Sequence, residues 1–279
     1  MMEKIKIITD STADLSQELY DKYDIEVLPL LINFGDESYL DGVEINPEEV
    51  FRRIEKDDIL PTTAQVIPTR FEEVYKKYLD EGYKIISIHM SSAMSGTYQS
   101  ACIAKNSLES DDIVVIDSQN VTSALGILVL KAAELREKGL ALHEIEQQII
   151  NSIDKVECSI VFESLEYLVR GGRISKTAGV LGGMLGIKVI LEIKDGLMSV
   201  KDKIRGNKKA IKRVISDLES ADLDTDLPVL LIDVQNIEVK QALKEYLTEN
   251  NIKYMECSVG STVSIHSGPR CCGLVFMTK

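Results

Sequence analysis

Hydroxyl-bearing side chains gather in residues 89–97, His-Met-Ser-Ser-Ala-Met-Ser-Gly-Thr, directly after the β-branched run 85–88. The run predicts a buried strand, and the residues from Tyr98 onward predict a helix. A strand, a hydroxyl-rich turn and a helix start together present backbone N–H groups, Ser/Thr donors and a helix dipole to an anion. A carboxylate or a phosphate is therefore the expected ligand. The alternative is that Ser95 only caps the helix, as serine often does.

Two further polar turns follow predicted strands. Asp10 and its neighbours in 9–14 come after the strand 5–8, and residues 117–120 come after the strand 113–116. Asp10 could bind a ligand or simply order the loop. Ligands of parallel sheets sit outside the carboxyl ends of the strands, so three such turns favour a site at that edge. A separate loop, 60–65, adds the adjacent hydroxyls of Thr62 and Thr63.

The known catalytic motifs are absent: there is no GxSxG, GxxxxGK[ST], HExxH, or GxGxxG after a strand. Ser95 could act as a nucleophile with His89 or His266, but the sequence places no carboxylate to orient either histidine. His266 lies among small residues, where it could face a pocket or be structural. The five cysteines form no CxxC and no metal-ligand spacing with the three histidines. The sequence thus predicts no metal site.

Basic residues concentrate in 201–213, where seven Lys/Arg are opposed only by Asp202. This run is either a solvated helix face or a patch that meets a phosphorylated ligand or an acidic partner. Arg170 and Arg173 frame the turn Arg-Gly-Gly-Arg. They could pair with an anion or brace the turn by bonding carbonyl groups.

Length and charge limit the classes of function. The chain has 279 residues, a net charge of −13, 44% hydrophobic and 28% charged residues, as expected for a globular protein of two modest domains. Residues 1–150 hold 14 Lys/Arg against 28 Asp/Glu, whereas 151–279 hold 18 against 17. Such acidity disfavours nucleic acid and anionic membranes as general partners. We expect no signal peptide at the start of the chain, and 178–187 is too short to span a bilayer. Reduced cysteines would indicate a cytoplasmic protein.

The order of predicted elements indicates an α/β protein with two domains. Strands and helices alternate through 1–156, which predicts a mainly parallel sheet flanked by helices on both faces. Residues 157–279 mix strands and helices around the hairpin signal Asp195-Gly196, which predicts an α+β domain. The glycine-and-aliphatic segment 178–186 suits either close packing around an elongated apolar ligand or tight helix packing.

The motifs together resemble those of the DegV family of bacterial lipid-binding proteins. The resemblance covers essentially the whole chain and rests on seven blocks in one order: 8–14 (ITDSTAD), 63–65 (TAQ), 91–101 (SSAMSGTYQSA), 117–118 (DS), 167–175 (YLVRGGRIS), 203–206 (KIRG) and 266–269 (HSGP).

This resemblance implies that one long-chain fatty acid, such as palmitate, lies in a tunnel between two domains. It implies no cofactor, no nucleic-acid partner, only transient membrane contact, and no catalytic centre in the chain itself. The protein would present the fatty-acid carboxylate to a separate ATP-using fatty acid kinase subunit, which makes the acyl phosphate for phospholipid synthesis. The alternatives are a lipid-sensing module that serves no kinase and a hydrolase or transferase acting on an acyl group.

The family's functional positions carry over residue by residue. Four residues would bind the carboxylate or lie near the head group: Thr63, Ser95, His266 and Arg170. Four would form the supporting loops: Thr62, Ser92, Gly96 and Thr97. Lys203 and Arg205 would face the kinase or the phosphate.

The chain departs from the family pattern in three places. Ala64 replaces a serine and Val66 a proline, so one hydroxyl donor is lost at this loop. Arg270, Cys271 and Cys272 replace small residues, which bears on the length or shape of the acyl chain.

Overall fold

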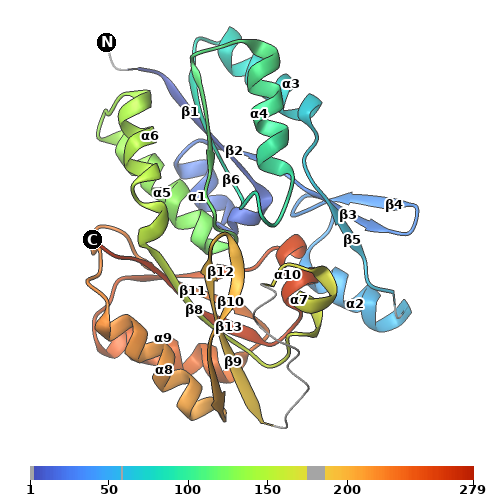
Figure 1. The fold of residues 1–279 in the computed structure, drawn as a ribbon, viewed down its shortest axis with the longest axis vertical. Coiled ribbons are helices and arrows are strands. Elements are labelled where there is room, and N and C mark those ends of the chain that lie inside the picture. Colours follow the sequence, from blue (N-terminus) through green and yellow to red (C-terminus); the bar gives the residue numbers. More distant parts are fainter. Residues whose placement is uncertain (1–2, 58, 175–185) are drawn as a thin grey trace.

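Two β-sheets of different construction organise the molecule, one above the other in Figure 1. The structure is a computed structural model and describes residues 3–57, 59–174 and 186–279. The predicted glycine-and-aliphatic segment 178–186 lies outside the described residues apart from Gly186.

The first sheet is parallel, in the strand order β2–β1–β6–β7. Its central strands are β-branched and buried on both faces, as expected for a parallel sheet covered by helices. Figure 1 shows α3 and α4 on one side of it and α5 and α6 on the other. The predicted parallel sheet is therefore confirmed. Its elements are β1 (Ile5–Asp10), η1 (Ser11–Ala13), α1 (Gln17–Lys22), β2 (Ile25–Leu28), α3 (Pro68–Asp80), β6 (Lys84–His89), α4 (Thr97–Leu108), β7 (Ile113–Asp117), α5 (Ser123–Glu137) and α6 (Leu142–Ile150).

A small antiparallel sheet, ordered β4–β3–β5, projects to one side with α2 below it (Figure 1). It consists of β3 (Leu31–Phe34), β4 (Glu37–Leu40) and β5 (Thr62–Ala64), with α2 at Pro47–Asp57. The sequence interpretation made 60–65 a loop, which is wrong for 62–64. Three residues are too few for a recognisable alternation, and β5 is a strand because it pairs with β3.

The second sheet is mixed, in the order β10–β9–β8–β13–β11–β12. Among the described strands of this sheet, β11 and β12 pair in parallel and the other neighbours pair antiparallel. The predicted hairpin is confirmed, because Asp195 and Gly196 join β9 to β10 with positive φ angles of 51° and 74°. The elements are η2 (Ile153–Lys155), β8 (Val156–Phe162), α7 (Glu166–Gly171), β9 (Ile187–Lys194), β10 (Leu197–Arg205), α8 (Asn207–Ser220), β11 (Val229–Val234), α9 (Ile237–Glu249), β12 (Tyr254–Ser258), α10 (Ser261–Ser267) and β13 (Cys271–Met277).

Helix α5 links the two sheets. It contacts β1 and β6 above and β8, β11 and β13 below, and most of its side chains are buried all round. Helix α5 also packs closely on η1, and Gly126 permits this approach, because a Cβ there would lie 2.5 Å from the carbonyl oxygen of Ala13. The predicted division between residues 156 and 157 falls at the start of β8.

Helix α10 and the start of β13 differ from the sequence-based expectation. The sequence analysis named no helix in residues 259–268 and treated Cys271 and Cys272 only as departures from the family pattern. The structure places a helix at Ser261–Ser267 and begins the last strand at Cys271. α10 follows β12 but packs on α2, β3 and η1. The C-terminal segment therefore contributes a helix to the space between the sheets. Among the described helices, none is both long and apolar enough to cross a membrane.

Candidate ligand-binding site

A cavity of about 320 Å³ lies between the parallel and the mixed sheet. Its upper wall comes from loops that follow β6 and β7, as predicted for the carboxyl edge of the parallel sheet. Its lower wall comes from strands of the mixed sheet, and β5 and α10 close one end. Segments from both halves of the chain thus meet around one space.

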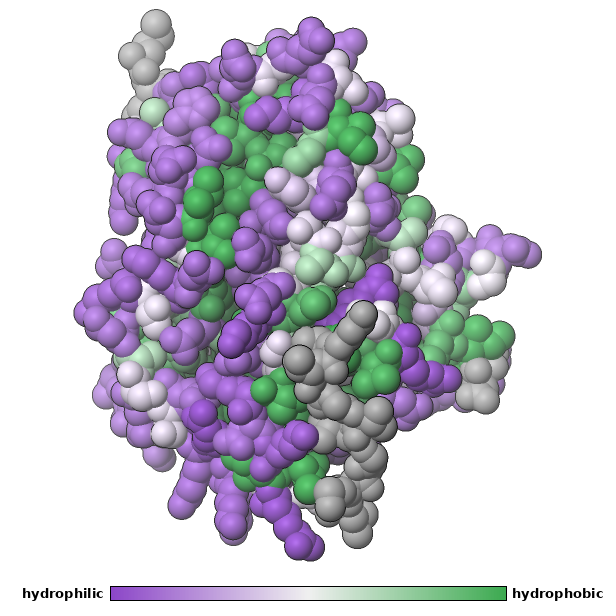
Figure 2. Space-filling model, in the orientation of Figure 1, coloured by the Kyte–Doolittle hydropathy of each residue, from purple (hydrophilic) through white to green (hydrophobic). Residues whose placement is uncertain are grey.

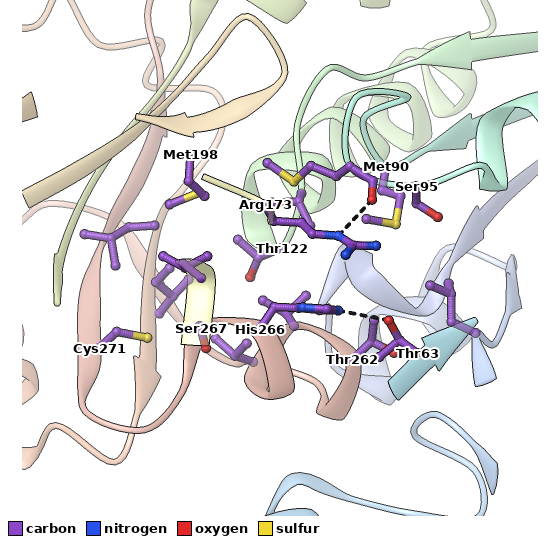
Figure 3. Close-up of a pocket in the computed structure, with 18 of the residues that line it drawn as sticks. Thr63, Met90, Ser95, Thr122, Arg173, Met198, Thr262, His266, Ser267 and Cys271 are labelled. Atoms are coloured by element: carbon purple, nitrogen blue, oxygen red, sulfur yellow. Dashed lines mark hydrogen bonds between the residues drawn. The ribbon is translucent and has the colours of Figure 1, made fainter. Parts of the chain in front are cut away.

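Thr63 and His266 meet at one end of this cavity although 203 positions separate them in the chain. Thr63 Oγ1 lies 2.9 Å from His266 Nε2 (Figure 3). Thr63 lines the cavity, whereas its neighbour Thr62 is exposed. His266 is seated against Gly171, where a Cβ would lie 2.5 Å from Nδ1. A larger residue at 171 would displace the imidazole.

The imidazole of His266 is neutral at physiological pH. Its burial, and then the charge of Arg173, lower the pKa of His266 to about 4. Nε2 can therefore donate its hydrogen to Thr63 Oγ1 in the Nε2–H tautomer. The hydroxyl hydrogen of Thr63 is then free to reach a ligand.

Arg173 extends into the same end of the cavity, with its guanidinium above His266 in Figure 3. Its Nε donates to the carbonyl oxygen of Met94 at 3.2 Å, and Nη1 donates to that of Gly171. Within the described residues it forms no ion pair with a carboxylate. A half-buried cation without an acidic neighbour is suited to bind an anion.

Ser95 also lines the cavity, from the loop before α4. Its Oγ lies 3.0 Å from Thr97 Oγ1 and accepts a longer bond, at 3.3 Å, from the backbone N–H of Thr97. Gly96, rather than Ser95, occupies the N-cap position of α4. Ser92 supports the loop, because its backbone N–H donates to Asp117 Oδ1 at 3.1 Å. Ser95 thus orders the helix start and faces the cavity as well.

The remainder of the cavity is mainly apolar, although Thr122 and Ser267 also line it, and it lies mainly on the mixed sheet. Figure 3 places Met198 and Cys271 at the end away from Thr63 and Ser95. The cavity therefore has a polar end and an apolar end. Its main apolar side chains in this half are Ile160, Phe162, Leu168, Met198, Ile232 and Cys271.

Comparison with known proteins bears on this site. The profile of a family described as an uncharacterised protein of the DegV family matches residues 4–279. The chain belongs to the DegV family. The predicted resemblance is therefore confirmed.

Several relatives match this DegV chain over nearly its whole length. A DegV domain-containing protein of Clostridium perfringens is 55% identical over 278 residues, covering 100% of both chains. A solved fatty-acid-binding DegV protein from Thermus thermophilus is 28% identical, with a TM-score of 0.91 and coverage of 99% of this chain and 100% of that one. A stearic-acid-binding protein from Eubacterium ventriosum is 26% identical, with a TM-score of 0.86 and coverage of 99% and 98%. Two solved structures of such proteins thus share the fold of this DegV chain.

Arg170, carried over from the DegV pattern to the head group, lies outside the cavity. Its side chain is 61% exposed and pairs with Glu166 at 3.4 Å, one helical turn away. Helix α7 ends at Gly171, and Gly172 takes a left-handed conformation with φ of 70°. The chain reverses there and directs Arg173 inward instead. Of these two arginines, Arg173 is the one that lines the cavity.

Lys203 and Arg205 lie on β10, and neither lines this cavity. Both are exposed and have no ion pair in the part of the chain that the structure describes. Arg205 borders a shallow hollow of about 490 Å³ at the start of α8, together with Lys188, Lys208 and Lys209. Figure 2 shows a mainly hydrophilic surface over α8 and α9.

His89 is oriented by a carboxylate that the sequence analysis did not find. Its Nδ1 lies 3.0 Å from Asp10 Oδ2, and its Nε2 lies 2.6 Å from Ser87 Oγ. Tyr75 donates its hydroxyl to Ser87 at 2.7 Å. Asp10, Ser87 and His89 are fully buried, so a substrate has no access to this serine. Asp10 also accepts from the N–H of Met90 at 3.0 Å, so the cluster orders the loop after β6.

The residues that depart from the DegV pattern lie in different parts of the structure. Ala64 and Cys271 line the cavity, whereas Val66 is buried in the core and Arg270 is exposed. Burial raises the pKa of Cys271 to about 12, so its thiol is neutral and serves as apolar lining. Among the described residues, no group of three or more His, Cys, Asp or Glu side chains is arranged to hold a metal ion.

Proposed function

We propose that this DegV protein binds one long-chain fatty acid, such as palmitate, with the carboxylate at the polar end of the cavity and the chain along its apolar walls. The observation that carries the proposal is Arg173, a half-buried cation without an acidic neighbour among the described residues, at the polar end of a mainly apolar cavity. The fatty-acid-binding relatives of the same fold support it.

The acyl chain and the carboxylate of the ligand would contribute differently to binding. Each buried methylene of the chain is worth about 0.8 kcal/mol before ordering costs, so most of the affinity comes from the tail. Each hydrogen bond to the carboxylate is worth about 1.5–3 kcal/mol, so the head group sets the orientation. Thr63, Ser95 and Arg173 supply these donors, and neutral His266 fixes the hydroxyl of Thr63.

The protein would present its fatty acid to a separate ATP-using fatty acid kinase subunit, which forms the acyl phosphate for phospholipid synthesis. It would need no catalytic centre and no cofactor of its own for this role. The hydroxyl of Ser95 bonds to Thr97 rather than to a histidine, which disfavours the alternative of an acyl hydrolase. The basic surface of Lys203 and Arg205 would face the kinase or the phosphate.

The proposal places this exchange in the cytoplasm, with only transient membrane contact and no nucleic acid. The five cysteines are free, a state that persists in a reducing compartment. The remaining alternative is a lipid sensor that serves no kinase. It differs from the proposal only in the partner to which the lipid-loaded protein binds.

Native mass spectrometry of the purified protein tests the binding proposal. We expect one adduct per chain, and lipid released with solvent should be identified as a long-chain fatty acid. A protein that carries no lipid, and that binds none when incubated with palmitate after delipidation, would refute the proposal.

A further inference from the structure

Thr262 lies in the first turn of α10, one helical turn before His266. Positions i and i+4 share a helix face, and both side chains line the cavity. Figure 3 shows Thr262 beside Thr63 at the polar end. The sequence analysis did not single out Thr262, because no helix was expected at 261–267. The spacing Thr-x-x-x-His would have indicated it once that helix was known.

The hydroxyl of Thr262 is buried and has no hydrogen-bond partner among the described residues. The residue is 3% exposed, and although its backbone N–H donates to Asp41 Oδ2 at 3.3 Å, its Oγ1 has no partner in the part of the chain that the structure describes. Other cavity hydroxyls are paired: Thr63 with His266, Thr122 with Asp14, and Ser95 with Thr97. Thr262 thus differs from these other cavity residues, because its hydroxyl is unpaired among the described residues.

An unpaired buried hydroxyl destabilises a protein, because it loses its hydrogen bonds to water and gains none in return. Valine has nearly the same shape and would fill the same space without this cost. A threonine at such a position is explained if its hydroxyl has a partner when the cavity is occupied.

We propose that Thr262 is a further head-group residue, whose hydroxyl donates a hydrogen bond to the carboxylate of the bound fatty acid. The inference rests on the proposed function. A carboxylate accepts about four hydrogen bonds through its two oxygens, so Thr262 adds to the donors Thr63, Ser95 and Arg173 without displacing them. α10 then contributes two side chains to the site: Thr262 bonds the ligand, and His266 orients Thr63.

The test compares Thr262→Val with Thr262→Ser in delipidated protein. Palmitate affinity is measured by calorimetry well below the melting temperatures, and Tm is measured without ligand. We expect Thr262→Val to bind palmitate at least tenfold more weakly, because a hydrogen bond to a charged group is lost. Its ligand-free Tm should equal or exceed that of the wild type, because an unpaired hydroxyl is gone. Thr262→Ser keeps the hydroxyl and should bind within about threefold of the wild type.

Three results would overturn the inference. Wild-type affinity in Thr262→Val would show that the hydroxyl does not meet the ligand. A ligand-free Tm that falls in Thr262→Val would show that the hydroxyl serves the fold, and a loss of affinity equally large in Thr262→Ser would exclude the hydrogen bond as its cause. Failure of the proposed function is distinguishable, since the wild type itself would then not bind palmitate.

Discussion

At the polar end of the cavity, Arg173 donates to two backbone carbonyls but has no acidic partner within the described residues. Those two bonds hold the side chain in place and leave its charge uncompensated. An anionic ligand at this position would gain a charge-assisted bond without displacing an existing ion pair.

Replacing Arg173 with methionine should weaken palmitate binding about tenfold to a hundredfold, because one charge-assisted hydrogen bond is lost. Arg170→Met is the matched control: it removes the same charge three residues away, from an exposed side chain that pairs with Glu166. Isothermal titration calorimetry with palmitate measures the affinity of both variants. Equal losses in both variants would mean that only the net charge matters and not the position of Arg173.

The titration of His266 should make the stability of the folded protein depend on pH. Its pKa is about 4 in the folded protein, against 6.5 for an ordinary histidine, because burial and then Arg173 disfavour the charged ring. Between these values the unfolded chain takes up a proton that the folded chain does not. The free energy of unfolding therefore decreases as the pH falls from about 6.5 to about 4.

In His266→Gln this part of the pH dependence should disappear. Urea unfolding at pH 7 and at pH 4.5 measures it in both proteins. The wild type should lose more stability between the two pH values than the variant does. An identical loss in both would show that His266 is not the group responsible.

At the scale of elements, α10 is the helix that assembles the polar end, and two carboxylates from the N-terminal half hold it. Asp14 Oδ1 accepts from the N–H of Gly260 at 2.9 Å, and Asp41 Oδ1 accepts from that of Ser261 at 3.1 Å. The first N–H groups of a helix need such partners, and negative charge is favourable there. Burial raises the pKa of Asp14 well above its usual range, so Asp41 is the more suitable anchor to test.

Asp41→Asn should lower the free energy of unfolding by about 0.5–2 kcal/mol, the usual value of an N-cap. It should also weaken palmitate binding, because α10 carries Thr262 and His266 into the site. Asp36→Asn, in the exposed turn between β3 and β4, is the control and should change neither quantity. Unchanged affinity in Asp41→Asn would mean that α10 keeps its position without this anchor.

Sequence patterns predicted the strands of the parallel sheet better than the short elements β5 and α10. The runs behind β1, β6 and β7 are β-branched and bounded by polar turns, so they were recognised. β5 and α10 were not, because their three and seven residues depend on tertiary partners rather than on a repeating pattern. The motifs named Thr63, Ser95 and His266, which do line one cavity. They could not decide between Arg170 and Arg173, because that choice follows from how the chain turns at Gly172.

At the scale of the whole molecule, the cavity and the basic residues of β10 and α8 lie in different places. The cavity lies between the sheets, whereas five basic residues of β10 and α8 are exposed on the surface. Lys203, Arg205, Lys208, Lys209 and Lys212 have no ion pair in the described ranges, on a protein of net charge −13. A basic patch on an acidic protein favours one docking orientation for an acidic partner.

The double variant Lys203→Glu/Arg205→Glu should therefore bind palmitate like the wild type but fail to support acyl-phosphate formation by a cognate kinase. Phosphorylation of bound labelled palmitate measures the second property. Lys76→Glu/Lys138→Glu changes the net charge equally at exposed sites far along the chain and should remain active. Normal turnover by the first variant would remove the proposed docking surface.

The central claim is that one cavity holds a fatty acid with its carboxylate at the polar end. A crystal structure of the complex with 16-bromohexadecanoic acid tests it most directly, because anomalous scattering locates the bromine independently of the rest of the ligand. The account predicts the bromine at the apolar end, toward Met198 and Cys271, and the carboxylate within hydrogen-bonding distance of Thr63 and Arg173. A bromine beside Arg173, or a ligand bound outside the space between the two sheets, would contradict it.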